Sequence, residues 1–223
     1  IRKLFFNNIK KYLIFLKNMR KHFITISGNI GAGKSSLTKM LSEKLGWIPF
    51  YESVEDNPYL EDFYNDMKKW SFHLQIYFLS KRFNDSHSIL KLNESVILDR
   101  TLYEDGEIFA RNLYELGNMS ERDYKNYKQL YNILINYLPK PDLMIYLRSD
   151  VDFLLQRIKK RSRDFEASIP KEYLLRLNNY YEEWISKYKI SDLLIIDVKK
   201  YDYVNNSDDL NFVVNQIMER IKK

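Results

Sequence analysis

The segment that decides the fold is Gly28-Asn29-Ile30-Gly31-Ala32-Gly33-Lys34-Ser35. It matches the pattern G-x-x-x-x-G-K-[S/T] and lies between a β-rich run at residues 22–27 and a stretch with apolar residues at helical spacing. Glycines allow backbone N–H groups to approach phosphate oxygens at a helix N-terminus. Lys34 can charge-pair with the β- and γ-phosphates, and Ser35 can bind Mg²⁺. The segment, extended to Ser36, therefore predicts a site for ATP and Mg²⁺; a plain Gly-rich turn is the alternative.

Short apolar strands alternate with helices along the rest of the chain. We expect further strands at residues 47–52, 95–98, 143–147 and 193–196. Helices are expected at about 68–92, 105–116, 121–138 and 170–187, with another that begins at 151 and a terminal helix at the end. This alternation predicts an α/β fold with a parallel, doubly wound sheet of about five strands flanked by helices. Ligands of such sheets bind at the carboxyl ends of the strands. With 223 residues, 45% of them hydrophobic, we expect one domain at residues 19–223.

The net charge of +6 comes from the first residues of the chain. Residues 1–21 hold seven of the 36 Lys and Arg and no acid, which leaves 29 basic and 30 acidic residues and a net charge of −1 in the remainder. We therefore expect no nucleic-acid partner. Residues 1–18 form a basic leader whose longest apolar run, at 12–16, is too short to span a bilayer.

Two interpretations of the leader are open. It is a membrane-surface segment, or translation begins at Met19 and residues 1–18 are not made. We prefer the second interpretation and expect no membrane partner. Cys is absent, so we also expect a reducing, cytoplasmic compartment.

Charged residues follow the second and third expected strands. Glu52 ends the second strand, where a carboxylate can take the proton of a hydroxyl acceptor as general base; an exposed strand-end acid is the alternative. Asp99 and Arg100 end the third strand and offer an anion for Mg²⁺ and a guanidinium for phosphate or the acceptor oxygen. A structural salt bridge is the alternative for this pair.

An arginine cluster follows the fourth strand. Arg157 and Arg161 are four residues apart and share a helical face, Arg163 comes next, and Glu166 lies just beyond. A solvated helix face is the ordinary interpretation of such a cluster. In a phosphoryl-transfer enzyme the same spacing can place arginines over the γ-phosphate.

Together these segments resemble the deoxynucleoside kinase family, from about residue 23 to about residue 203. The resemblance rests on five pieces in one order, at residues 28–35, 51–60 (including Asn-Pro-Tyr-Leu), 70–75 (Trp-Ser-Phe-His-Leu-Gln), 99–105 (Asp-Arg-Thr-Leu-Tyr-Glu-Asp) and 157–166. The chain looks most like the bacterial deoxyguanosine and deoxyadenosine kinases, which have Asp before Arg100 where animal relatives more often have Glu. The resemblance implies a P-loop kinase with an arginine-rich lid, a homodimer, and transfer of the γ-phosphoryl group of ATP to a deoxynucleoside 5′-hydroxyl.

The resemblance also implies individual roles. Glu52 would be the base, with Arg100 near the 5′-oxygen. Lys34, whose role follows from the phosphate-loop motif, is the third catalytic candidate. The nucleoside would be bound by the following residues: Gln75 at the nucleobase edge, Tyr64 and Glu166 at the sugar 3′-hydroxyl, and Arg82 with Asp105 as the pair that favours purine or cytosine. Purine is our expectation, although Phe78 predicts a tighter pocket than this pair suggests.

The residue chemistry agrees with these roles and leaves alternatives. Gln offers one donor and one acceptor, and an Arg–Asp pair presents both polarities to a base edge. Gln75 and Arg82 are seven residues apart, which is also typical of the polar face of an ordinary helix. Aromatic residues of the same helix, such as Trp70 and Tyr77, are more typical of a core than of a base-stacking platform.

Two other functions share part of this pattern. A nucleoside monophosphate kinase has the same loop and lid, but Glu52 would repel an acceptor that already bears a phosphate. A nucleotide-binding switch or a nucleic-acid-linked ATPase is disfavoured by the net charge of −1 and by the lack of an Asp-rich strand motif that could activate water.

Overall fold

The described residues form a five-stranded parallel sheet in the order β2-β3-β1-β4-β5. The computed structural model of the chain describes residues 21–52, 57–161 and 169–222, so the basic leader at 1–18 lies outside it. The strands are β1 (Phe23–Gly28), β2 (Ile48–Phe50), β3 (Val96–Asp99), β4 (Leu143–Arg148) and β5 (Asp192–Asp197). The predicted α/β fold with about five parallel strands is confirmed.

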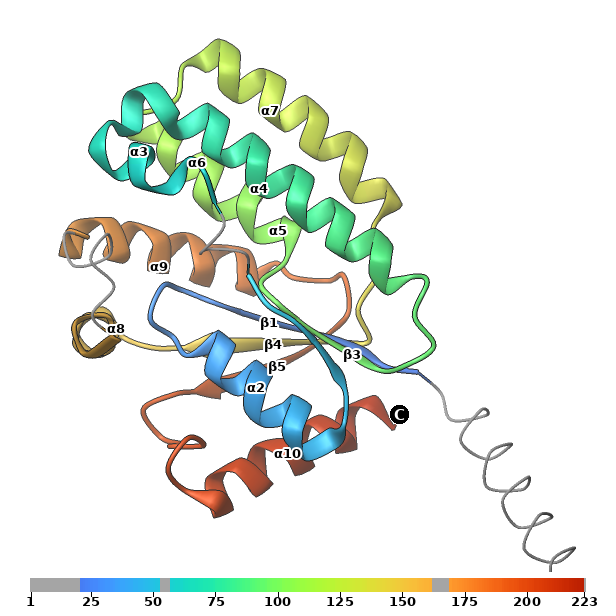
Figure 1. Cartoon of the computed structure of the whole chain (residues 1–223). Helices are drawn as coiled ribbons and strands as arrows, with labels where there is room; N and C mark the ends of the chain where they lie inside the picture. The colour runs from blue at the N-terminus through green and yellow to red at the C-terminus, as the bar shows by residue number, and fades with distance from the viewer. Residues whose placement is uncertain (1–20, 53–56, 162–168, 223) are drawn as a thin grey trace, which may run out of the picture.

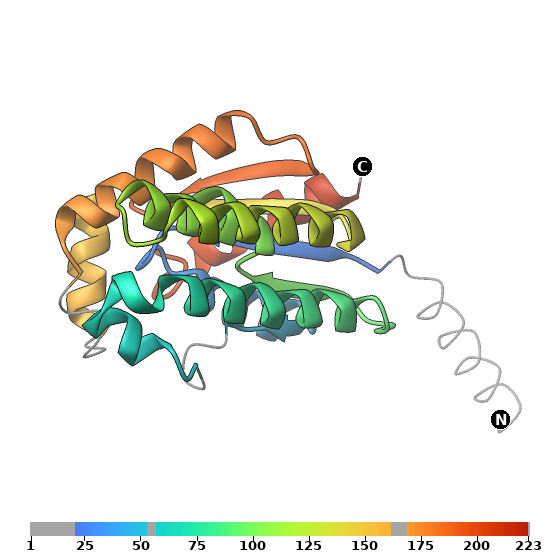
Figure 2. The ribbon, with the colours of Figure 1, turned by 90° about the horizontal axis from the view of Figure 1, so that it is seen from above.

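Helices cover both faces of this sheet (Figures 1 and 2). One face carries α2 (Lys34–Leu45) and α10 (Ser207–Ile221), and the other carries α4 (Met67–Ile89), α6 (Ala110–Glu115), α7 (Glu121–Leu134) and α9 (Lys171–Ser186). The short helix α3 (Leu60–Asn65) packs beside α4, and α8 (Val151–Arg161) follows β4. The strand order reverses direction at β1, which lies between β3 and β4. Sheets of this class have a ligand-binding crevice at the carboxyl end of the strand where the order reverses.

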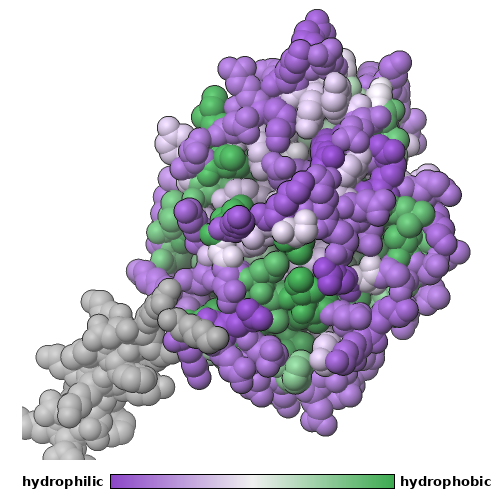
Figure 3. Space-filling view, turned by 180° about the vertical axis from the view of Figure 1, so that it is seen from behind, coloured by the Kyte–Doolittle hydropathy of each residue, from purple (hydrophilic) through white to green (hydrophobic). Residues whose placement is uncertain are grey.

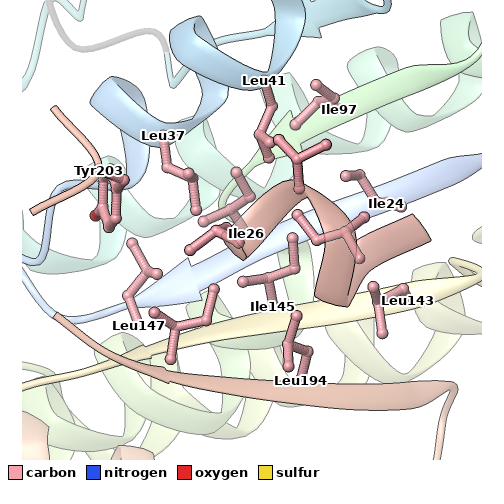
Figure 4. Packing of buried hydrophobic residues seen from close by; sticks show 14 of the residues in the cluster. Ile24, Ile26, Leu37, Leu41, Ile97, Leu143, Ile145, Leu147, Leu194 and Tyr203 are labelled. Atoms are coloured by element: carbon pink, nitrogen blue, oxygen red, sulfur yellow. The ribbon is translucent and has the colours of Figure 1, made fainter. Parts of the chain in front are cut away.

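The main core lies between β1 and the helices α2 and α10 (Figure 4). Ile24 and Ile26 of β1 pack with Leu37 and Leu41 of α2, and none of these four side chains is exposed. Each buried aliphatic side chain contributes about 1.5–3 kcal/mol. This packing fixes α2 against β1, and therefore fixes the loop that joins them.

Several boundaries differ from the expected ones. The second strand ends at Phe50, so Glu52 lies two residues beyond it. The expected helix at 105–116 begins earlier, as α5 (Leu102–Glu104), and passes through a π-helical turn (Asp105–Phe109) before α6. The expected helix at 121–138 ends as α7 at Leu134, followed by a 3₁₀ turn (Ile135–Tyr137), because the prolines at 139 and 141 stop it.

The π-helical turn brings a glycine against an aromatic ring. A Cβ on Gly106 would lie less than 3.0 Å from the ring of Tyr131 in α7. Only glycine allows this approach, and π-helical turns are common at functional sites. The turn begins at Asp105, one of the predicted binding residues.

The surface agrees with the charged composition. The face seen in Figure 3 is mostly hydrophilic with separated apolar patches. Among the described helices, none combines the length and the apolar character that a membrane crossing requires.

Candidate active site

The phosphate loop joins β1 to α2, and its last glycine has a left-handed backbone conformation. Gly33 has φ 95°, and a Cβ there would lie 2.8 Å from a guanidinium nitrogen of Arg157 and 2.9 Å from the hydroxyl of Tyr203. Lys34 follows at the start of α2, and its Nζ donates to the carbonyl oxygen of Asn29 at 3.1 Å. Burial, with a smaller contribution from Arg100, lowers the pKa of the Lys34 amine to about 8.

The Asn29 side chain braces the loop against α9. Its Nδ2 donates to the carbonyl oxygen of Leu174 at 3.1 Å, and its Oδ1 accepts from the backbone N–H of Ile30 at 2.8 Å. Gly28, Asn29 and Ala32 therefore shape the loop, whereas its remaining members line the cavity described below: Ile30, Gly31, Gly33, Lys34, Ser35 and Ser36.

Ser35 and Asp99 form the predicted metal pair. The Oγ of Ser35 donates to Oδ2 of Asp99 at 2.5 Å, and Asp99 is only 1% exposed. Its other oxygen, Oδ1, is buried without a hydrogen-bond partner among the described residues. Such an oxygen suits a cation, and Mg²⁺ needs only one or two protein oxygens beside substrate phosphates. The two residues therefore fit Mg²⁺.

A chain of charged side chains extends from the loop across the crevice. Arg100 donates from Nε to Oε2 of Glu52 at 3.1 Å. Arg82 donates from Nη2 to Oε1 of Glu52 at 2.7 Å and from Nε to Oδ2 of Asp105 at 2.6 Å. Glu52 is thus shared by two arginines. The sequence analysis named all four residues as candidates, but it did not predict that Arg82 would bridge Asp105 and Glu52.

In both Glu52 and Asp105, burial raises the pKa of the carboxyl group and the neighbouring arginines lower it. Burial raises the pKa of Glu52, but Arg100, Arg82 and Lys34 outweigh it and the pKa falls well below its usual range. For Asp105, burial prevails over the nearby arginines and raises the pKa to about 7. Glu52 is therefore ionised at neutral pH.

These groups line one cavity of about 230 Å³. Gln75 of α4 is 3% exposed and lines it, and its Oε1 has no hydrogen-bond partner in the described part of the chain. Tyr64 and Phe78 also line it, and the Arg82 guanidinium lies 5.0 Å from the centre of the Phe78 ring. The cavity therefore combines apolar walls with a few polar groups, as small-molecule sites do.

Other lining residues were not predicted from sequence: Leu60, Phe63, Leu74, Phe109 and Tyr173. They are apolar or aromatic residues of helices, so their spacing is the same as that of core residues. No sequence signal distinguishes them from the core.

The arginine cluster is only partly described. Arg157 of α8 donates to the carbonyl oxygen of Ala32 at 3.2 Å, and Arg161 lines the cavity. Arg163 and Glu166 lie outside the described residues, and their roles stay predictions.

A phosphate loop beside a carboxylate, two arginines and a small-molecule cavity defines a phosphotransferase. The family model for deoxynucleoside kinases matches residues 24–222. The chain therefore belongs to the deoxynucleoside kinase family, as its motifs predicted. It is a deoxynucleoside kinase.

Curated and solved relatives agree with this assignment. The deoxyadenosine/deoxycytidine kinase of Bacillus subtilis is 40% identical over 89% of this chain and 92% of the relative. The deoxyguanosine kinase of Lactobacillus acidophilus is 41% identical over 90% of this chain and 91% of the relative. The solved structure of deoxyadenosine kinase from M. mycoides, with dCMP and dCDP bound, superposes with a TM-score of 0.79 at 36% identity, covering 88% of this chain and 99% of that one.

Proposed function

We propose that this deoxynucleoside kinase transfers the γ-phosphoryl group of ATP to the 5′-hydroxyl of deoxyadenosine or deoxyguanosine, with deoxycytidine as the third candidate acceptor. The product is the 5′-monophosphate, and the reaction serves nucleotide salvage. The cytoplasm, where ATP and Mg²⁺ are available, is the proposed compartment.

The observation that carries the choice of base is the placement of Arg82. It is held between Asp105 and Glu52 at the cavity, which Gln75 of the same helix also lines; the Oε1 of Gln75 has no hydrogen-bond partner among the described residues. Arginine donates, aspartate accepts and glutamine does both, so the group suits bases that present adjacent donors and acceptors. Adenine, guanine and cytosine also carry an exocyclic amino group that a carboxylate such as Asp105 can accept from, and thymine has none. The names of the bacterial relatives support the same three bases.

The proposed chemistry at the 5′-oxygen belongs to three residues. Glu52, which is ionised, accepts the proton of the 5′-hydroxyl. Arg100 and Lys34 offset the negative charge that moves toward the acceptor. To act as a base, Glu52 has to exchange part of its contact with Arg82 for the substrate hydroxyl. Mg²⁺, which Ser35 and Asp99 would hold, supplies positive charge to the phosphate oxygens when bound.

We also propose a homodimer. Large apolar side chains are exposed along the outer helix α7 and just beyond the ends of α7 and α4: Leu90 (58%), Leu130 (37%), Ile133 (51%) and Tyr137 (70%). These two helices lie side by side (Figures 1 and 2). A self-association surface would cover these side chains.

The test of the proposed function is steady-state phosphorylation by the full chain with Mg·ATP. The acceptors are the four deoxynucleosides and, separately, their 5′-monophosphates. We expect turnover of deoxyadenosine or deoxyguanosine above that of thymidine. Turnover of monophosphates alone would overturn the proposal and favour a nucleoside monophosphate kinase.

A further inference from the structure

Arg100 has an unusual backbone conformation. Its φ is 70°, which no other non-glycine residue adopts in residues 21–52, 57–161 and 169–222. Residues other than glycine populate this region sparsely and persist there when their surroundings hold them. The Arg100 N–H donates to the carbonyl oxygen of Ile26 at 2.9 Å, which fixes the turn to β1. The side chain needs its own support.

A fully buried carboxylate, Glu104, lies directly behind this turn. Its Oε2 accepts from the backbone N–H of Thr101 at 2.8 Å and from its hydroxyl at 3.2 Å. Its Oε1 accepts from the N–H of Gly28, the first residue of the phosphate loop, at 3.4 Å and lies 3.6 Å from Nη1 of Arg100. One carboxylate thus joins the loop that binds phosphate to the turn that carries the arginine.

Tyr181 of α9 completes the support. Its buried hydroxyl accepts from Nη1 of Arg100 at 2.8 Å and donates to Oε1 of Glu104 at 2.8 Å. Burial raises the pKa of this hydroxyl well above its usual range, so it keeps the proton that it donates. The Arg100 guanidinium also lies 4.5 Å from the centre of the Phe109 ring. Of its other two nitrogens, Nε donates to Oε2 of Glu52.

We propose that Glu104 and Tyr181 are positioning residues for the phosphoryl transfer. They hold the guanidinium of Arg100 at the acceptor oxygen and fix its position relative to the start of the phosphate loop. A displacement of about 1 Å in such a group can cost about 100-fold in rate. The inference rests on the proposed role of Arg100. Neither residue lines the cavity.

The first test removes only the hydroxyl oxygen of Tyr181. Tyr181→Phe keeps the ring and removes both hydrogen bonds, so we expect kcat to fall by about 10- to 100-fold while KM for ATP changes by less than about twofold. The matched control is Tyr146→Phe. Tyr146 is equally buried and stacks on Tyr181, with the two ring centres 5.9 Å apart. Its hydroxyl donates to Oε1 of Glu182 at 3.0 Å and not to the groups that hold Arg100.

We expect Tyr146→Phe to keep kcat within about twofold while it lowers Tm by an amount similar to Tyr181→Phe. A general loss of packing would reduce kcat equally in both variants, and that result would overturn the inference. Glu104→Gln is the second variant, in case Tyr181→Phe fails to fold; it keeps the shape of the side chain and is expected to lower kcat by a similar factor.

A double-mutant cycle separates this inference from its premise. In an Arg100→Met background, Tyr181→Phe is expected to change single-turnover rates by less than about twofold, because the group that it positions is gone. An undiminished effect there overturns the inference. So does a normal kcat in both Tyr181→Phe and Glu104→Gln when Arg100→Met is impaired. If the wild type phosphorylates no deoxynucleoside, the proposed function falls. If Arg100→Met keeps full kcat, only the proposed role of Arg100 falls, and the inference falls in either case.

Discussion

Replacement of Glu52 by Gln tests the proposed chemistry most directly. The change preserves the size of the side chain and removes the charge that two arginines share, at 2.7 Å from Arg82 and 3.1 Å from Arg100. A positioned general base contributes about 10²–10⁴ in rate. Because its arginine partners hold the pKa of Glu52 well below its usual range, it is a weak base, and we expect a loss near the lower end, about 10²-fold in kcat.

The same change has a calculable effect on stability. One amide hydrogen bond replaces two charged ones, while Arg82 keeps Asp105 at 2.6 Å and Arg100 keeps Tyr181 at 2.8 Å. We therefore expect a loss of only about 1–3 kcal/mol. The pKa of Glu52 is lower in the folded state than in the unfolded one, so its ionised form stabilises the fold above about pH 4.5 and this contribution is lost as pH falls toward the folded pKa. The unfolding free energies of wild type and variant should therefore converge at acidic pH.

The assay combines calorimetry of deoxynucleoside binding with steady-state turnover. Binding within about tenfold of wild type, together with the lost kcat, would confirm the role of Glu52 as base. Glu182→Gln is the matched control, since Glu182 also pairs with an arginine, Arg148, at 2.7 Å but lies outside the cavity. A Glu52→Gln enzyme with near-wild-type kcat would refute the reasoning.

Three further predictions concern other parts of the site. Burial lowers the pKa of Lys34 to about 8, so affinity for ATP, measured by calorimetry, should fall by up to about tenfold per pH unit above pH 8; a constant affinity to pH 10 would contradict this. Gly106→Ala would place a Cβ less than 3.0 Å from the Tyr131 ring and should cost about 1–3 kcal/mol of unfolding free energy in denaturant titrations, in spite of the better helix propensity of Ala. Asp105→Asn replaces the carboxyl group that accepts from Arg82 with an amide, and kcat/KM should fall by about 10- to 100-fold with a changed ranking of bases; an unchanged ranking would remove Asp105 from base selection.

The sequence by itself determined the fold and the chemical class. The pattern at residues 28–35 depends on local requirements, namely glycines where backbone must approach phosphate and a lysine at the start of a helix. The alternation of strands and helices is equally local, because it follows from the spacing of apolar residues. The family model and the solved relative confirm both.

Tertiary structure alone decided how the charged groups are connected. Arg82 and Glu52 are 30 residues apart, and Tyr181 is 77 residues from Glu104 and 81 from Arg100. Contacts at such separations depend on how helices dock on the sheet, and no local spacing encodes them. In the sequence Glu104 is only one residue of the piece at 99–105, and the hydrogen bonds of the folded chain show that it joins Thr101, Gly28 and Tyr181.

The same reason explains the cavity. Phe109 and Tyr173 have the spacing of core residues, yet the π-helical turn and the docking of α9 place them at its wall. Whether an apolar side chain faces a core or a ligand depends on what packs opposite it. The sequence therefore determined which chemistry the chain carries, and the packing of distant elements determined where each group acts.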